Sequence, residues 1–227
     1  MKRNFSSNAI NYWAKLDAGK VYHFYNHGVG RDNLFLEDAN YHFFIEKWKK
    51  YFGHYMDVYA YCLMPNHFHV LGKFKPITEQ IRQQIQKEQT SKSRAYVEGR
   101  ITITTFYESQ FKRFFTSYSR AYGKRYNRVG SLFRAKFKRT LIRNKARFMD
   151  KLFYIHHNPI HHRFTWTYQA YRYSSYHDYL NQNGDFIYLP ILKYFGDTPE
   201  EAIEGFFQAH EIYRLTYLSV NSKFSDK

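Results

Sequence analysis

Residues 64–71 read Met-Pro-Asn-His-Phe-His-Val-Leu. Proline followed by asparagine is a turn signal, and the run after it is apolar except for His67 and His69. Along a strand, successive side chains point to opposite faces, so the two histidines share one face while Phe68 and Val70 point into a core. The residues before the turn are also apolar and aromatic. The stretch therefore predicts a β-hairpin with one strand on each side of the turn.

Two imidazoles side by side on a rigid strand supply two ligands of a metal site. The same pair is also compatible with two packed histidines on a half-buried strand. Whether His67 and His69 bind a metal or only pack therefore depends on the residues that the rest of the chain places beside them.

The remaining pattern alternates between strands and helices. A sheet with helices packed on it, in a single α/β sandwich, is the fold that this alternation predicts. The polar segment 75–100 is compatible with either an exposed helix or a loop. Pro159 should end the helix that Asn144 begins, because the residue before a proline is biased away from helical geometry. The predicted strands are 21–25, 55–64, 67–74 and 131–142, the last with one basic face, and the predicted helices are 38–52, 105–126, 144–158 and one that begins at a Thr198 capping box.

The composition points to a phosphate-bearing partner. Among 227 residues, 35 are Lys or Arg and 19 are Asp or Glu, which gives a formal net charge of +16. Aromatic residues make up 21% of the chain. Basic and aromatic side chains together are typical of surfaces that follow a nucleic-acid backbone and stack on unpaired bases. The single cysteine, Cys62, excludes an internal disulfide. We find no signal sequence and no membrane-spanning stretch, which favours a cytoplasmic protein.

One stripe of the helix 144–158 carries unusual side chains. Tyr154 and Asn158 are four residues apart and so lie on the same face. Arg147 and Lys151 fall roughly on this face too. Placed against the histidine pair, Asn158 could give a metal a third ligand, and Tyr154 would stand beside that metal as a nucleophile. A divalent cation that holds a phosphate would make its phosphorus more electrophilic.

With these two motifs in order, the sequence resembles the HUH single-tyrosine transposases, the family of insertion-sequence transposases and REP-associated tyrosine transposases. The resemblance covers most of the chain and rests on motifs in a fixed order. The two most specific are Met-Pro-Asn-His-x-His at 64–69 and Tyr-Ile-x-x-Asn-Pro at 154–159, and the others are at 22–26, 126–127, 130–133, 137–138 and 173–176.

The resemblance implies an α+β fold with a central antiparallel sheet flanked by helices, of the ferredoxin-like or RNA-recognition-motif-like kind. It implies that His67 and His69 bind the metal and that Tyr154 attacks a DNA phosphate, which leaves a 5′-phosphotyrosine and a free 3′-hydroxyl. Asn158 matches the position that completes the metal site, where several insertion-sequence members have Gln, and His157 is an alternative third ligand. The metal is expected to be Mg or Mn.

The expected partner is single-stranded or hairpin DNA, bound by a cytoplasmic, nucleoid-associated protein that could form a homodimer. We expect a basic leader at 1–18, a catalytic domain at 19–185 and a C-terminal tail with an amphipathic helix at 186–227. Most of the histidines at 156, 157, 161 and 162 are expected to face solvent or DNA. The predicted DNA-binding residues are Arg120, Lys124, Arg125, Arg128, Arg134, Lys136, Lys138, Arg147 and Lys151.

Two other functions are compatible with the same residues. The chain could be a domesticated family member that recognises structured DNA with little or no strand transfer. It could also be a hydrolase in which water replaces Tyr154 as the nucleophile. The first predicts binding without metal-dependent cleavage, and the second predicts cleavage that survives the loss of the tyrosine.

Overall fold

The computed structural model describes residues 11–135 and 137–222. Its centre is an antiparallel sheet of four strands in the order β2-β3-β1-β4. The predicted α+β class with a central antiparallel sheet flanked by helices is therefore confirmed. The strands are β1 (Val21–His27), β2 (Met56–Met64), β3 (His67–Phe74) and β4 (Lys138–Ile142).

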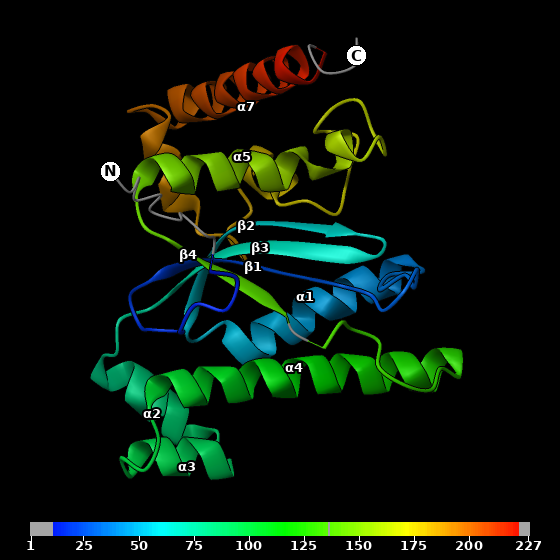
Figure 1. The fold of residues 1–227 in the computed structure, drawn as a ribbon. Coiled ribbons are helices and arrows are strands. Elements are labelled where there is room, and N and C mark those ends of the chain that lie inside the picture. Colours follow the sequence, from blue (N-terminus) through cyan, green and yellow to red (C-terminus); the bar gives the residue numbers. More distant parts are fainter. Residues whose placement is uncertain (1–10, 136, 223–227) are drawn as a thin grey trace, which may run out of the picture.

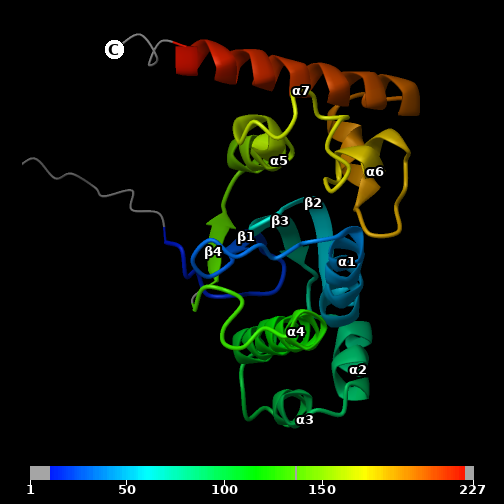
Figure 2. The ribbon, with the colours of Figure 1, turned by 90° about the vertical axis from the view of Figure 1, so that its right-hand side faces the viewer.

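Helices cover both faces of this sheet. Helices α1 and α4 lie on one face and α5 on the other, with α7 stacked outside α5 (Figures 1 and 2). Helices α2 and α3 pack at the far side of α4. The helices are α1 (Asp38–Phe52), α2 (Glu79–Lys87), α3 (Ser91–Val97), α4 (Ile103–Tyr126), α5 (Lys145–His161), α6 (Tyr176–Leu180), the 3₁₀ helix η1 (Leu189–Tyr194) and α7 (Pro199–Ser222).

The core between the sheet and helices α1 and α4 is aromatic. Phe24 of β1 and Phe68 of β3 point to this face, where Phe68 packs against Phe44 of α1 with ring centroids 5.0 Å apart. Trp48 and Phe111 complete the contact between the two helices and the sheet. Burying each such side chain contributes about 1.5–3 kcal/mol. The apolar alternation of the hairpin therefore fixes which face carries the histidines.

The segment 75–100, which the sequence left open between helix and loop, forms two short helices. Thr78 caps α2 by accepting a hydrogen bond from the backbone N–H of Ile81, and Thr90 forms a capping box with Ser93 at the start of α3. Each cap satisfies N–H groups that the first helical turn leaves without partners. The polar composition of the segment is that of two capped surface helices.

Two predicted boundaries were wrong. The strand expected at 131–142 is regular only at Lys138–Ile142, since before it Phe133 makes a single bridge to Gly28 and Gly130 has a φ of 91°. Helix α5 continues through Pro159 to His161. The His162 N–H still reaches the Asn158 carbonyl at 2.9 Å, and Pro159 is buried, so packing outweighs the proline bias.

The first and last described segments both pack against the rest of the fold. Within the predicted leader, Ala14 and Leu16 are buried, and the Ala14 N–H donates to the carbonyl of Arg139 in β4. Residues 1–10 of that leader lie outside the described residues. At the other end, Thr198 and Glu201 form the reciprocal bonds of the predicted capping box, and α7 then packs against α5. The domain limits drawn at 18 and 185 stay predictions.

Candidate active site

The histidine pair lies on the sheet face that α5 covers. His67 and His69 are both buried, and their ring centroids are 5.2 Å apart. Helix α5 packs on β2 and β3, so its inner face meets the pair directly. Burial lowers the pKa of His67 to about 4 and the pKa of His69 well below its ordinary value. Both imidazoles are therefore neutral near pH 7, which is the form that binds metal.

The neighbouring strand β1 adds two histidines to which the sequence had assigned no role. His23 Nε2 lies 2.9 Å from His69 Nδ1, and the His27 ring stacks on His67 at 4.8 Å. Burial lowers the pKa of His23 to about 3. Residues 23, 25 and 27 alternate along β1 just as 67 and 69 do along β3. This spacing of two residues in the sequence could have shown that His23 and His27 share a face of β1.

Tyr154 and Asn158 project from α5 onto these imidazoles, as their spacing predicted. The Tyr154 ring meets His69 edge to face at 5.6 Å and His23 at 6.2 Å. Asn158 Oδ1 lies 3.4 Å from His67 Nε2, while its Nδ2 donates to the Tyr154 carbonyl. The fold therefore brings together the four side chains that the sequence motifs singled out, one helical turn apart on α5 and two residues apart on β3.

Both ring nitrogens of His67 face amide oxygens, which can only accept: Nδ1 lies 2.7 Å from Asn66 Oδ1 and Nε2 lies 3.4 Å from Asn158 Oδ1. The neutral ring has one N–H, and the shorter contact assigns it to Nδ1. The lone pair is then on Nε2, facing Asn158 Oδ1, another lone-pair atom. Two ligands each about 2.1 Å from one cation lie about 3.0–3.4 Å apart at angles near 90–110°. The observed 3.4 Å separation fits two ligands of a shared cation.

A metal site at the histidine pair could draw its third protein ligand from Asn158. Among the described residues, no three or more His, Cys, Asp or Glu side chains are arranged to hold a metal ion. A site here would use the two imidazole nitrogens of His67 and His69 and the Asn158 carboxamide oxygen. All three ligands are neutral, so they would leave the full double charge of the cation to act on a phosphate.

The residues around Tyr154 leave its hydroxyl protonated near pH 7. Burial raises the pKa of its phenol above the ordinary value, and the hydrogen bond with Asn158 lowers it in part. The Lys151 ammonium lies over the ring, 4.7 Å from its centroid, and also pairs with Asp150 at 3.2 Å. The cation that the sequence placed on this stripe is thus in contact with the tyrosine, although a carboxylate shares its charge.

The other histidines of this region divide between two environments. His157 Nδ1 lies 3.2 Å from the Tyr168 hydroxyl, and its ring packs against Tyr213 of α7, so the structure does not bring it to the histidine pair. His156 is also buried, between Ser175 and His210. Most of the histidines at 156, 157, 161 and 162 were expected to face solvent or DNA, and this was wrong, because only His161 and His162 are exposed. The His162 ring lies 5.1 Å from that of His67.

The predicted DNA-binding cations do not form one cluster. Lys138 lies over the rings of Tyr12 and Tyr25, on the same sheet face as the histidine pair. Arg147 is exposed on α5, and Arg128 pairs with Asp32. Lys136 lies outside the described residues.

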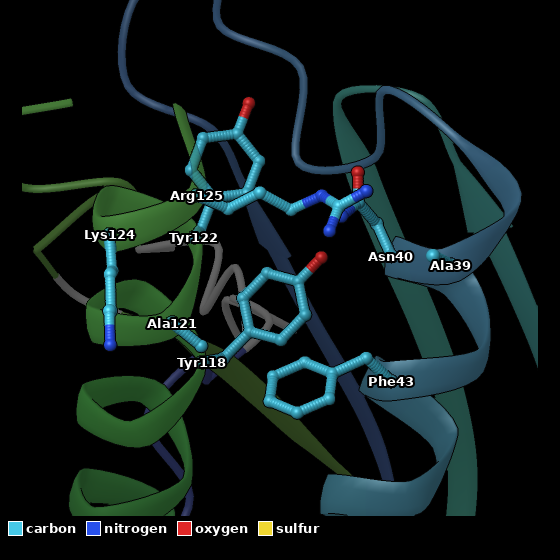
Figure 3. Close-up of a pocket in the computed structure, with 8 residues that line it drawn as sticks. All are labelled: Ala39, Asn40, Phe43, Tyr118, Ala121, Tyr122, Lys124 and Arg125. Atoms are coloured by element: carbon cyan, nitrogen blue, oxygen red, sulfur yellow. The ribbon is translucent and has the colours of Figure 1, made fainter. Parts of the chain in front are cut away.

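Lys124 and Arg125 lie on the opposite side of the molecule, at a cavity of about 480 Å³ between α1 and α4. Figure 3 shows Phe43 and Tyr118 projecting into it from the two helices. Arg125 forms an ion pair with Glu37 there. A second cavity, on the other side of α4, has Arg120 and Arg134 in its wall.

The fold is similar to that of a REP-associated tyrosine transposase whose structure was solved bound to a REP hairpin. The two chains are 16% identical with a TM-score of 0.53, and the match covers 76% of this chain and 86% of the other. At this identity the likeness establishes the fold, and it confirms at that level the resemblance seen in the sequence motifs. No family model matches the chain, and no curated protein matches it. Among the described residues, no helix is long and apolar enough to span a membrane.

Proposed function

We propose that this chain is a metal-dependent DNA strand transferase of the single-tyrosine transposase type. One observation carries the proposal: the Tyr154 ring lies against His69 and His23, while Asn158, one turn further along α5, faces His67. Two neutral imidazoles and a carboxamide oxygen could hold a divalent metal, and a phenol beside them could attack a phosphate bound to that metal.

His67, His69 and Asn158 would hold a divalent metal, with Mg or Mn the expected ion. When bound, the metal would polarise a phosphate oxygen and offset the charge that builds up in the transition state. Asn66 and His23 would keep the two metal-binding imidazoles in place by hydrogen bonds to their Nδ1 atoms. The Asn158 amide is held through its donation to the Tyr154 carbonyl.

Tyr154 would supply the attacking oxygen. Its hydroxyl loses a proton and forms a bond to the phosphorus, while the bond from phosphorus to the 3′ oxygen breaks and that oxygen gains a proton. The products are a 5′-phosphotyrosine and a free 3′-hydroxyl. The phosphodiester is exchanged for a phosphotyrosyl ester, so another 3′-hydroxyl can reverse the step without ATP.

Charge and fold support DNA as the substrate. The chain carries a net charge of +16, and the protein of similar fold was solved with a REP hairpin. Lys138, beside Tyr25, and Lys151, over Tyr154, put positive charge on the face that carries the histidines. We therefore propose single-stranded or hairpin DNA as the partner of this chain. A homodimer and an association with the nucleoid stay predictions.

The runner-up is a structure-specific DNA-binding protein of the same family with little or no strand transfer. It is favoured by the raised pKa of Tyr154, since a protonated phenol is a poor nucleophile. The hydrogen bond with Asn158 lowers this pKa only in part. Cleavage of a labelled DNA hairpin in Mn²⁺ separates the proposals. Strand transfer predicts cleavage by the wild type and none by Tyr154→Phe or by His67→Ala. Binding without metal-dependent cleavage by the wild type would favour the runner-up. Cleavage that survives Tyr154→Phe would point to water as the nucleophile.

A further inference from the structure

We propose that the cavity between α4 and the segment of residues 131–135 and 137 binds an unpaired nucleotide of the DNA. The proposal rests on the proposed function for its ligand, a DNA strand. We call this space the arginine cavity, because Arg120 of α4 and Arg134 stand in its wall. Its volume is about 340 Å³. Small-ligand pockets span about 300–1,000 Å³, so it is large enough for one small ligand.

Aromatic rings form the apolar part of the wall. Phe115 of α4 packs against Phe133 with ring centroids 4.8 Å apart and against Phe137 at 5.3 Å. All three line the cavity. Bases stack on aromatic side chains with little regard to sequence, and each stacked base contributes about 1–3 kcal/mol. This part of the wall suits a base that has left its own stack.

Two cations without carboxylate partners form the polar part of the wall. Neither Arg120 nor Arg134 forms an ion pair with a described residue, and Arg134 donates instead to the Gly28 carbonyl at 3.3 Å. Three other arginines of the described residues do pair with carboxylates: Arg125 with Glu37, Arg128 with Asp32 and Arg139 with Glu108. A guanidinium fork matches the geometry of a phosphate.

Hydroxyl groups complete the polar wall. Thr116 and Ser119 of α4 and Ser131 stand beside the arginines. Such groups bind phosphate and sugar oxygens, which position a nucleic acid without reading its sequence. Aromatic rings, hydroxyls and unpaired guanidinium groups in one small space match a nucleotide better than they match a purely apolar ligand.

The arginine cavity and the histidine pair lie on opposite faces of the same end of β1. Asn26 lines the cavity, while the next residue, His27, stacks on His67. The cavity wall is pinned to this point, because the Arg134 N–H donates to the His27 carbonyl at 2.9 Å and Asn26 donates to the Arg134 carbonyl at 3.2 Å. A DNA strand held at the histidine face would reach the cavity by passing around this end of β1.

Positive charge lies on both faces at this end of β1. Arg134 lines the cavity, while Lys138 lies over Tyr25 on the face that carries the histidines. Cations on both faces suit the phosphate backbone of a strand that passes from one to the other.

The test uses the full chain with Tyr154→Phe, without metal, so that no DNA is cleaved. Arg120→Ala with Arg134→Ala is compared with Lys92→Ala and Arg94→Ala, two exposed cations of α3, so both double variants lose the same charge. Labelled oligothymidylate and a duplex of equal length are the probes, read by fluorescence anisotropy. The proposal predicts at least about tenfold weaker single-strand binding than the control, with duplex binding within about twofold of it. Equal losses on both probes would overturn it.

A second readout is independent of those variants. Oligothymidylate that carries 5-iodouracil is cross-linked to Tyr154→Phe by light, and the peptides are mapped by mass spectrometry. Cross-links are expected at Phe115, Phe133 or Phe137, and cross-links confined to other peptides would overturn the proposal. The outcome is separable from that of the proposed function, since a chain that never cleaves DNA could still cross-link here, and a cleaving chain could fail to.

Discussion

Nε2 of His23 lies 2.9 Å from Nδ1 of His69, so a buried histidine of β1 holds a buried histidine of β3 through a hydrogen bond. If His69 binds metal through Nε2, its neutral ring must carry the proton on Nδ1 and donate it to His23. Such a partner fixes both the tautomer and the orientation of a metal-binding histidine. His23 is therefore a positioning residue for the proposed metal site.

Removal of His23 should weaken metal binding without removing a ligand. We expect His23→Ala to lower the affinity for Mn²⁺ by about 10- to 100-fold. His23→Gln, which keeps an acceptor for the His69 N–H, should recover part of the loss, and His42→Ala on the exposed side of α1 should have no effect. Isothermal titration calorimetry measures the affinities. Unchanged affinity in His23→Ala would contradict the positioning role, and nitrogen NMR of the metal-free protein reports the His69 tautomer directly.

Asn158 should matter for metal binding, and its neighbour His157 should not. Asn158→Ala removes the oxygen that lies 3.4 Å from His67 Nε2, so the affinity for Mn²⁺ should fall at least about tenfold. Asn158→Gln keeps a carboxamide and should retain part of the affinity. His157→Ala is the matched control, because that ring bonds Tyr168 on the side facing α7. A larger loss in His157→Ala than in Asn158→Ala would reverse the assignment.

The stability of the protein should fall as the pH drops below about 6.5, in part through His210. This residue is fully buried, bonds His156 and the Phe206 carbonyl, and has a pKa that burial lowers to about 3. In the unfolded chain it takes up a proton near pH 6.5, whereas in the folded chain it stays neutral. Unfolding therefore binds protons between these two values, and the free energy of unfolding falls with decreasing pH.

Each such histidine contributes a slope of about 1.4 kcal/mol per pH unit in that window. Urea unfolding at pH 7, 6 and 5 measures the slope. Other buried histidines add to it, so the informative quantity is the difference between the wild type and His210→Gln, which should have the shallower slope. Equal slopes would show that His210 does not titrate on unfolding.

DNA binding should be strongly salt-dependent. If 6–10 phosphates are contacted, affinity should fall by about 10³–10⁵ between 50 and 200 mM salt. The dissociation constant of a labelled hairpin, measured across that range with Tyr154→Phe, gives the slope. A dissociation constant that does not change with salt would remove the electrostatic basis of the proposal.

The sheet and the side chains facing it were largely predictable from the sequence because their periods are short. Strict alternation placed His67 and His69 on one face and Phe68 on the other, and a spacing of four placed Tyr154 and Asn158 together. These rules need only the geometry of one strand or one helix. They could not show which elements pack against each other, and so His23 was missed.

Features that depend on tertiary packing were less accessible. His156 looked polar and exposed, yet it is buried between Ser175 and His210, residues 19 and 54 positions away. Pro159 predicted the end of a helix that in fact continues while buried. In each case contacts distant in sequence outweighed a local preference. The arginine cavity is of the same kind, because Arg120 and Arg134 meet only when α4 lies beside the end of β1.

The most direct test of the central claim is to trap the covalent bond between Tyr154 and DNA. The wild type is incubated with Mn²⁺ and a DNA hairpin labelled so that the strand 3′ of the cleaved bond is followed, and adducts that survive denaturation are mapped by mass spectrometry. We predict a DNA phosphate on Tyr154 in the wild type, and no adduct in Tyr154→Phe or when EDTA replaces the metal. An adduct that persists in Tyr154→Phe, or that maps to another residue, would contradict the account.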